Sequence, residues 1–267
     1  MTNFKCGVLD AWVQGLPASG RYTFTRQEAM QATGLTHGAF RLVSMRLSSQ
    51  RVIVRLHQNL YAVIPLEYRA VGVLPAEWVV DDLLVHIGQK YYLGLLTAAA
   101  LHGAAHQRPR VCQVVTDRPV RPVEVHGMGI RFYVSNRLAE TDTVQIKGEV
   151  GYLPVSTPEE TAFDLVRYSR QLGGLSQVAT VLQELGEKLN GDKLGEVAIR
   201  RDRLPETQRL GWLLERGGFN AAAYPLHEWL STQKKEYVPL ALSSSIQGAT
   251  RDSRWKLWLN EEIEEDL

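Results

Sequence analysis

The spacing of apolar residues between positions 25 and 65 predicts two helices at a steep angle. Thr25 and Glu28 stand at capping-box spacing, in which each side chain satisfies a free amide at a helix start. Gly34 is expected to end this helix, because glycine readily adopts the left-handed conformation found at helix ends. Thr36 then caps a second helix, whose apolar stripe consists of Phe40, Val43 and Leu47. The connection is so short that the pair predicts a helix-turn-helix.

After Ser48-Ser49 the pattern changes from helical to alternating. Val52, Val54 and Leu56 alternate with Ile53 and Arg55, and a second apolar run extends from Leu60 to Ile64. The polar residues between these runs predict a turn, so the segment is expected to form a β-hairpin. A helix-turn-helix followed by a hairpin is a winged helix-turn-helix. A short helix at residues 4–15 is expected to pack beneath it.

Basic charge is concentrated in the same segment. From Arg21 to Arg55 the chain has six arginines and one acid, Glu28, although its formal net charge is only +1. Such segregated positive charge is typical of phosphate contact, and arginine also forms bidentate hydrogen bonds with guanine. We therefore predict DNA binding. The alternatives are a small helical domain with a solvated basic face and a winged helix that binds protein.

The predicted DNA contacts come from the second helix, the cations around it and the hairpin turn. The N-terminal half of the second helix is expected to enter the major groove, as in helix-turn-helix proteins. The predicted DNA-binding residues are Arg26, Thr36, His37, Arg41, Ser44, Arg46, Arg51, Arg55, His57, Gln58 and Asn59. Among them, Thr36 is expected to serve mainly as a helix cap.

Beyond Pro65 the pattern predicts an α+β domain. Pro75 precedes a helix expected to bury Trp78, Val79, Leu83 and Ile87. An alanine-rich helix stops at Gly103, and strands are predicted at residues 111–116, 123–126, 130–134 and 150–154. Thr157 and Pro158 then signal another helix start. The acids Glu159, Glu160 and Asp164 that follow are explained by their place near the positive end of the helix dipole.

The rest of the chain is predicted to be mainly helical. Helices are expected at residues 178–189, 205–216 and 225–230, and the first of them is expected to end at Asn190-Gly191. Two late strands are expected at residues 237–242 and 255–259, joined by a polar loop at residues 243–253. The predicted fold class is α+β. Its expected parts are a winged helix-turn-helix at residues 1–74, an α+β domain at residues 75–170 and a mainly helical C-terminal region at residues 171–267.

The sequence contains few residues in patterns typical of catalytic or metal-binding sites. His102 and His106 are four residues apart, but Gly103 lies between them, so no metal site and no cofactor are predicted. The chain has no phosphate-binding glycine loop, no nucleophile elbow and no cysteine nucleophile with a placed histidine. We therefore predict no catalytic residues and no enzymatic activity.

Composition places the chain in the cytoplasm. Cys6 and Cys112 are few and far apart, which indicates a reducing compartment and no disulfide framework. No apolar run approaches the roughly 20 residues that span a bilayer. Asp10 interrupts the region where a signal peptide would need to be apolar.

Several motifs together resemble the AbiEi-type antitoxin family, the DNA-binding partners in type IV toxin–antitoxin systems. They are the hairpin end at Asn59–Pro65, the stretch Tyr92–Gly103 with the strand Cys112–Thr116 after it, and the helix start at Ser156–Val166. Their order and spacing carry the resemblance more than any single motif does. From residue 175 onward it rests mainly on helical character.

The resemblance implies a bacterial protein with two functions. The N-terminal domain would bind inverted repeats in its own promoter and repress the operon. The C-terminal region, residues 75–267, would neutralise a co-encoded AbiEii-like nucleotidyltransferase toxin in defence against phage, without requiring a stable complex. Two alternatives remain: a ligand-responsive winged-helix transcription regulator, and a DNA-guided nuclease, against which the missing active-site residues count.

Overall fold

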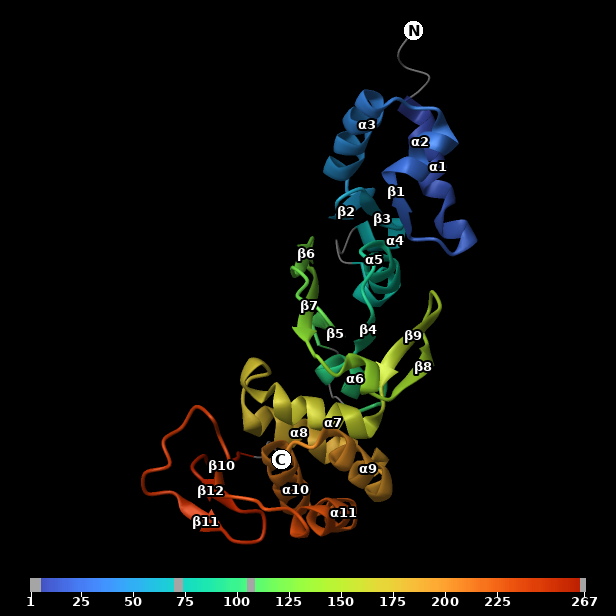
Figure 1. The fold of residues 1–267 in the computed structure, drawn as a ribbon. Helices are drawn as coiled ribbons and strands as arrows, with labels where there is room; N and C mark the ends of the chain where they lie inside the picture. The colour runs from blue at the N-terminus through green and yellow to red at the C-terminus, as the bar shows by residue number, and fades with distance from the viewer. Residues whose placement is uncertain (1–5, 70–73, 105–108, 265–267) are drawn as a thin grey trace. The chain divides into compact units, whose positions relative to one another are not determined.

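Helices and sheets alternate in a computed structural model that describes residues 6–69, 74–104 and 109–264 (Figure 1). The predicted α+β class is confirmed. The chain divides into two compact units: unit 1 comprises residues 1–92, 110–139 and 145–154, and unit 2 comprises residues 93–109, 140–144 and 155–267. The division predicted near residues 74 and 170 stays a prediction, and part of the first boundary falls on residues 70–73, outside the described residues.

The N-terminal part of unit 1 contains three helices and a three-stranded antiparallel sheet. Its elements are α1 (Cys6–Gly15), η1 (Pro17–Ser19), β1 (Thr23–Thr25), α2 (Arg26–Thr33), α3 (His37–Ser49), β2 (Ile53–His57) and β3 (Leu60–Val63). The strand order is β1-β3-β2, so the predicted hairpin forms and β1 adds a strand that was not predicted. Helix α1 contacts both α2 and α3, as expected.

One hydrophobic core joins these helices to the sheet. The predicted stripe of α3 is buried, because Phe40, Val43 and Leu47 are at most 3% exposed. Tyr61 of β3 stacks on Phe24 with ring centroids 5.5 Å apart, and it meets Phe40 edge to face at 5.6 Å. Aromatic pairs of this geometry stabilise a core beyond the area that they bury. This core fixes the direction in which the outer face of α3 points.

The remainder of unit 1 contains α4 (Leu66–Arg69), η2 (Ala76–Trp78), α5 (Val80–His86), β5 (Val111–Thr116), β6 (Val123–Val125), β7 (Met128–Val134) and η3 (Leu138–Glu140). Strand β7 lies between β5, which is parallel to it, and β6, which is antiparallel. The helix predicted after Pro75 begins at Val80 instead. Consequently Val80 and Leu84 are buried, whereas Trp78 and Ile87, predicted to be buried, are only half-buried.

The chain continues through β8 (Thr143–Lys147) and β9 (Tyr152–Ser156), of which β8 was not predicted. Leu93 at the end of β4 (Tyr91–Leu93) pairs in parallel with Val155 of β9, and both of these residues belong to unit 2. The helices of unit 2 are α6 (Leu95–Leu101), α7 (Pro158–Arg167), η4 (Ser169–Gln171), α8 (Leu175–Leu185), η5 (Gly186–Lys188), α9 (Gly191–Arg201), α10 (Leu204–Arg216) and α11 (Asn220–Ser231).

A small sheet ends unit 2, in the order β10-β12-β11, with β10 (Val238–Pro239), β11 (Thr250–Asp252) and β12 (Leu257–Leu259). Three details correct the sequence prediction. Strand β11 lies within the predicted polar loop, and α11 begins at Asn220, before the predicted start at Pro225. The second late strand begins at Leu257, after Trp255, which is fully buried.

Replacing Gly211 with alanine is expected to destabilise unit 2. A Cβ atom on Gly211 of α10 would lie 2.0 Å from Cζ3 of Trp255, a side chain with no exposed surface. Forcing extra atoms into a packed core costs about 1–3 kcal/mol or more. The matched control is Gly15→Ala at the end of α1, where nothing lies within 4 Å of the added atom. Chemical denaturation of both variants checks this expectation, and equal stability would contradict it.

Candidate nucleic-acid interface

The junction of α2 and α3 is formed by the caps predicted from the sequence. The backbone amide of Thr25 donates to the Glu28 carboxylate at 2.7 Å, and the Thr25 hydroxyl accepts from the Glu28 amide at 3.2 Å. Gly34 ends α2 in the left-handed region, with φ of 66°. The Thr36 hydroxyl accepts from the amide of Ala39 at 3.4 Å and starts α3. The predicted capping box, glycine stop and second cap are confirmed.

The one acid of the basic segment is engaged by its neighbours. Burial raises the pKa of the Glu28 carboxyl, but hydrogen bonds from Thr25 and Arg21 outweigh it, so the net pKa lies below the usual value. The Arg21 guanidinium donates to Glu28 at 2.8 Å. Arg21 and Glu28 therefore form an ion pair, in which their opposite charges largely compensate each other. The other arginines of the segment are Arg26, Arg41, Arg46, Arg51 and Arg55.

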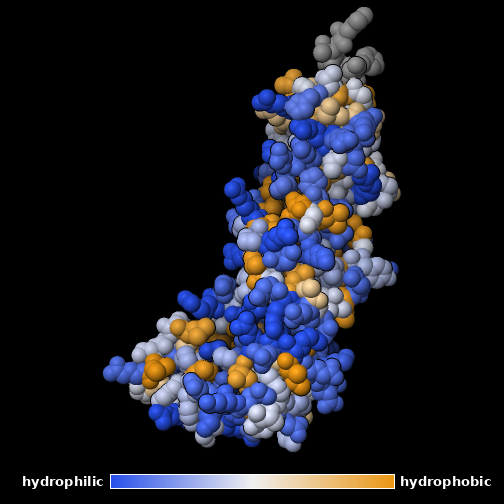
Figure 2. Space-filling model, viewed as in Figure 1, coloured by the Kyte–Doolittle hydropathy of each residue, from blue (hydrophilic) through white to orange (hydrophobic). Residues whose placement is uncertain are grey.

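Helix α3 has one continuous exposed face opposite its buried stripe. The exposed residues are His37, Gly38, Arg41, Leu42, Met45, Arg46 and Ser49. The Arg26 guanidinium, at the first residue of α2, donates to Nε2 of His37 at 2.7 Å. This hydrogen bond places Arg26 beside the N-terminal end of α3. Hydrophilic side chains cover much of the visible surface over these elements, with hydrophobic ones between them (Figure 2).

Ser44 differs from the other predicted contacts on α3. Its side chain is 6% exposed, and its hydroxyl donates to the carbonyl of Arg41 at 3.0 Å. It therefore lies on the buried side of the helix, next to Val43. Arg41 and His37 lie on the exposed face, one helical turn apart. The helical period predicts this division, because Ser44 lies one helical turn from both Phe40 and Leu47, which belong to the buried stripe.

The hairpin presents Arg55 to solvent and turns through Gln58 and Asn59. Asn59 has a left-handed φ of 65°, a conformation that asparagine tolerates better than most residues. Its carbonyl accepts from the Arg26 amide at 2.9 Å, which ties the turn to the start of α2. Arg51 also has a left-handed φ, 54°, and is exposed between α3 and β2.

The tip of the hairpin is held by α5, a contact that the sequence did not signal. Nε2 of His86 donates to the carbonyl of Gln58 at 2.9 Å. The rings of His86 and His57 meet edge to face with centroids 5.9 Å apart. A groove of about 550 Å³ lies beside this contact, and Arg55 and Arg121 are both among its lining residues. Sequence reasoning missed Arg121 because its local pattern is that of an ordinary turn.

Unit 2 contains a buried cluster of opposite charges between α7 and α9. The Arg201 guanidinium donates to Glu160 through Nε at 2.8 Å and to Asp164 through Nη2 at 2.8 Å. The exposed fractions of these three side chains are 8%, 1% and 2%. Arg200 also donates to Glu160. The acids were explained from the sequence as first-turn residues, and this explanation was incomplete, since they also bind the next helix but one.

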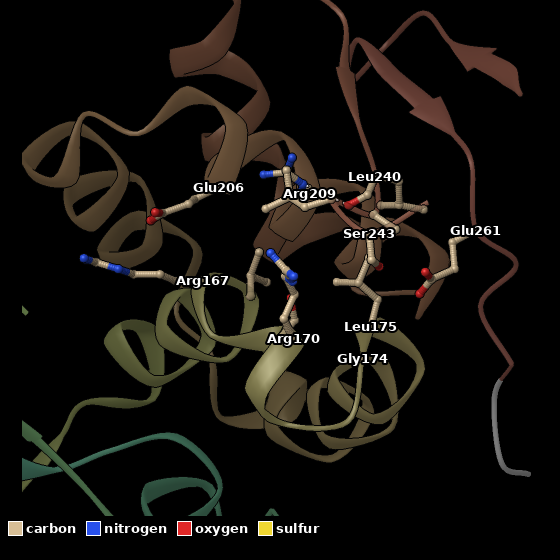
Figure 3. A pocket seen from close by; sticks show the side chains of 13 residues that line it. Arg167, Arg170, Gly174, Leu175, Glu206, Arg209, Leu240, Ser243 and Glu261 are labelled. Atoms are coloured by element: carbon tan, nitrogen blue, oxygen red, sulfur yellow. Dashed lines mark hydrogen bonds between the residues drawn. The ribbon is translucent and has the colours of Figure 1, made fainter. Parts of the chain in front are cut away.

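Unit 2 also contains a pocket of about 230 Å³, which is lined by side chains of both charge signs. Figure 3 shows Arg167, Arg170 and Arg209 around it, with Glu206 and Glu261 on opposite sides. Burial lowers the pKa of Arg209, whose guanidinium donates to the carbonyls of Pro205, Pro239 and Leu240. Burial raises the pKa of Glu206.

Of the two histidines considered for metal binding, His102 lies within the described residues and makes a hydrogen bond of its own. Nε2 of His102 donates to the carbonyl of Ser156 at 2.7 Å, which joins the end of α6 to β9. His106 lies outside the described residues. Within residues 6–69, 74–104 and 109–264, no group of three or more His, Cys, Asp or Glu side chains could hold a metal ion. Every helix in the same ranges is too short or too polar to cross a membrane.

Comparison with known proteins identifies an antitoxin domain. Residues 92–216, from β4 to the end of α10, match the family model of the AbiEi antitoxin C-terminal domain. This match confirms the resemblance to the AbiEi-type antitoxin family predicted from the sequence, over residues 92–216. An antitoxin acts against a toxin, which is the class of partner that this domain implies. Residues 1–91, including the basic segment, lie outside the match.

The fold also resembles a solved structure along most of its length. The crystal structure of the RV2827C protein from Mycobacterium tuberculosis aligns with a TM-score of 0.66, covering 94% of this chain and 90% of that chain. The two sequences are 14% identical, so the likeness concerns the fold alone. No curated protein matches the chain.

Proposed function

We propose that this antitoxin is also the repressor of its own operon, and that it binds operator DNA through residues 1–74. The observation that carries the proposal is the exposed face of α3, where Arg41 and Arg46 stand on a helix that begins beside Arg26. The DNA contacts that we propose are Arg26, His37, Arg41, Arg46, Arg51 and Arg55, together with His57, Gln58 and Asn59 of the turn. Thr36 acts as the helix cap, and Ser44 supports α3 from its buried side.

The arrangement of elements supports this assignment. Helices α2 and α3 are joined by three residues, and β2 and β3 follow as a hairpin, in the order of a winged helix-turn-helix. In such proteins the second helix of the pair lies in the major groove. Arginine at its exposed positions supplies both phosphate contacts and bidentate contacts to guanine.

The toxin that we propose is a nucleotidyltransferase of the AbiEii type, encoded in the same operon. The family match over residues 92–216 supports the antitoxin role. The type of toxin, the type IV mode without an obligatory stable complex and the role in phage defence follow from the family resemblance. Operon context gives a direct check, since the proposal requires a gene for such a toxin beside this one.

Salt dependence measures how many phosphates the interface neutralises. If about five are contacted, the logarithm of affinity should fall with the logarithm of salt concentration at a slope of roughly −4 to −5. The Arg55→Ala variant should flatten this slope by about one unit, on operator and on random duplexes alike. Fluorescence anisotropy with a labelled duplex from the region upstream of the gene gives both slopes.

The control for this measurement is Arg203→Ala, which removes an exposed arginine of unit 2. Its salt slope should equal that of the unchanged protein. An unchanged slope and affinity for Arg55→Ala would remove the hairpin from the interface. No detectable binding of the unchanged protein to its own upstream region would overturn the proposed repressor function.

A further inference from the structure

Two large apolar side chains stand at the centre of the cationic face of α3. Leu42 is 70% exposed and Met45 is 61% exposed. In a helix with about 3.6 residues per turn, both fall between Arg41 and Arg46 on the helix surface. The residues that share this central strip are small, namely Gly38 and Ser49. The face therefore has an apolar middle and a guanidinium group on each side.

Exposure alone would not assign a role to these side chains, because single apolar residues are common on protein surfaces. The flanking charge decides what can cover them. A second copy of this face would bring like charges together, which opposes association. The major groove of DNA offers the complementary pattern: phosphates along both edges and, on its floor, the C5 methyl group of each thymine as an apolar contact.

We propose that Leu42 and Met45 determine sequence specificity by packing against thymine C5 methyl groups in the major groove. This inference rests on the proposed function, and it adds the base that the apolar residues recognise. Arg41 and Arg46 would then hold the helix in register through phosphate or guanine contacts. Leu42 and Met45 would favour thymine over cytosine, which lacks the methyl group at the same position.

Deoxyuridine in place of thymidine tests the inference, because it removes only the methyl group. A duplex that binds tightly is first selected from a random pool with the full-length protein, and its thymines are then replaced one at a time. At a contacted position, loss of one buried methyl should weaken binding by the unchanged protein about fourfold. The Leu42→Ala or Met45→Ala variant that lacks the partner side chain should bind the two duplexes equally.

The matched control is Val8→Ala on α1, which removes another exposed apolar side chain, 44% exposed. It should retain the full sensitivity to deoxyuridine. The inference is overturned if no thymine shows an effect with the unchanged protein. It is equally overturned if both α3 variants keep the whole effect, or if they change self-association in analytical ultracentrifugation and leave the thymine dependence intact.

Failure of the proposed function is a separate result. It would appear as DNA affinity that does not respond to Arg41→Ala at all. A protein that loses affinity with Arg41→Ala but ignores the thymine methyl groups would keep the repressor proposal and lose only this one.

Discussion

Replacing Arg201 with methionine is expected to lower the free energy of unfolding by about 3–5 kcal/mol, the cost of removing one partner from a buried ion pair. The Glu160 and Asp164 carboxylates, 1% and 2% exposed, would then lose a donor that they share. Arg200 still reaches Glu160, whereas Asp164 loses the guanidinium that lies 2.8 Å from its carboxylate. Urea denaturation followed by circular dichroism measures the loss.

Two further variants separate the ion cluster from general damage. Arg203→Met removes an exposed arginine just beyond α9 and should change stability by less than about 0.5 kcal/mol. Asp164→Ala combined with Arg201→Met should cost less than the sum of the single changes, because the second removal no longer breaks an intact pair. A loss below about 1 kcal/mol for Arg201→Met would show that the cluster contributes little beyond packing.

The elements that sequence reasoning predicted well are those whose signals lie within a few residues. Thr25 with Glu28, and Thr36 alone, cap α2 and α3 through hydrogen bonds to amides three residues away. Thr157 does the same for α7. Such caps depend on local backbone geometry, so they can be found without knowledge of the rest of the fold.

The elements that were missed depend on partners far away in the chain. Strand β1 has three residues and exists because Thr23–Thr25 pairs with β3. Strand β11 forms within a polar segment because β12 offers it an edge. Neither segment has an apolar alternation of its own. Short edge strands of this kind follow from tertiary pairing more than from propensity.

Some residues that mark helix boundaries were recognised in the sequence but were assigned to the wrong end of a helix. Asn190-Gly191 was predicted to end a helix, yet the Asn190 side chain accepts from the amide of Lys193 and begins α9. Pro225 was predicted to begin a helix but lies inside α11, against Gly191 and Gly195 of α9. Asparagine, glycine and proline occur at both starts and stops, so one sequence leaves the direction open.

Only part of the candidate DNA interface could be predicted from the sequence. The helical period of α3 places Arg41 outward, as predicted, and it places Ser44 inward, although Ser44 was predicted to contact DNA. The contact of His86 with the hairpin tip and the presence of Arg121 in the groove arise from segments that only folding brings together. Periodicity therefore defines the face of a helix, whereas its neighbours require the tertiary structure.

Loss of DNA binding without loss of antitoxin activity is expected from the double variant Arg41→Ala, Arg46→Ala. Each arginine that reads a base or a phosphate contributes about 1–3 kcal/mol, so replacing both should weaken operator binding by at least about thirtyfold. Both residues lie outside the matched antitoxin domain at residues 92–216. Point changes suit this test because unit 1 joins residues 1–92 to residues 110–139 and 145–154, and a truncation near residue 75 would cut through it.

A promoter–reporter assay measures repression, and survival of cells that express the cognate toxin measures protection. The antitoxin is expressed from an unrelated promoter, so that loss of autorepression cannot change its amount. Repression should disappear in the double variant while protection persists, and Arg203→Ala should leave both unchanged. If the double variant is folded and equally abundant but fails to protect, the cationic face of α3 takes part in neutralising the toxin. The division of functions between residues 1–74 and the rest of the chain would then be wrong.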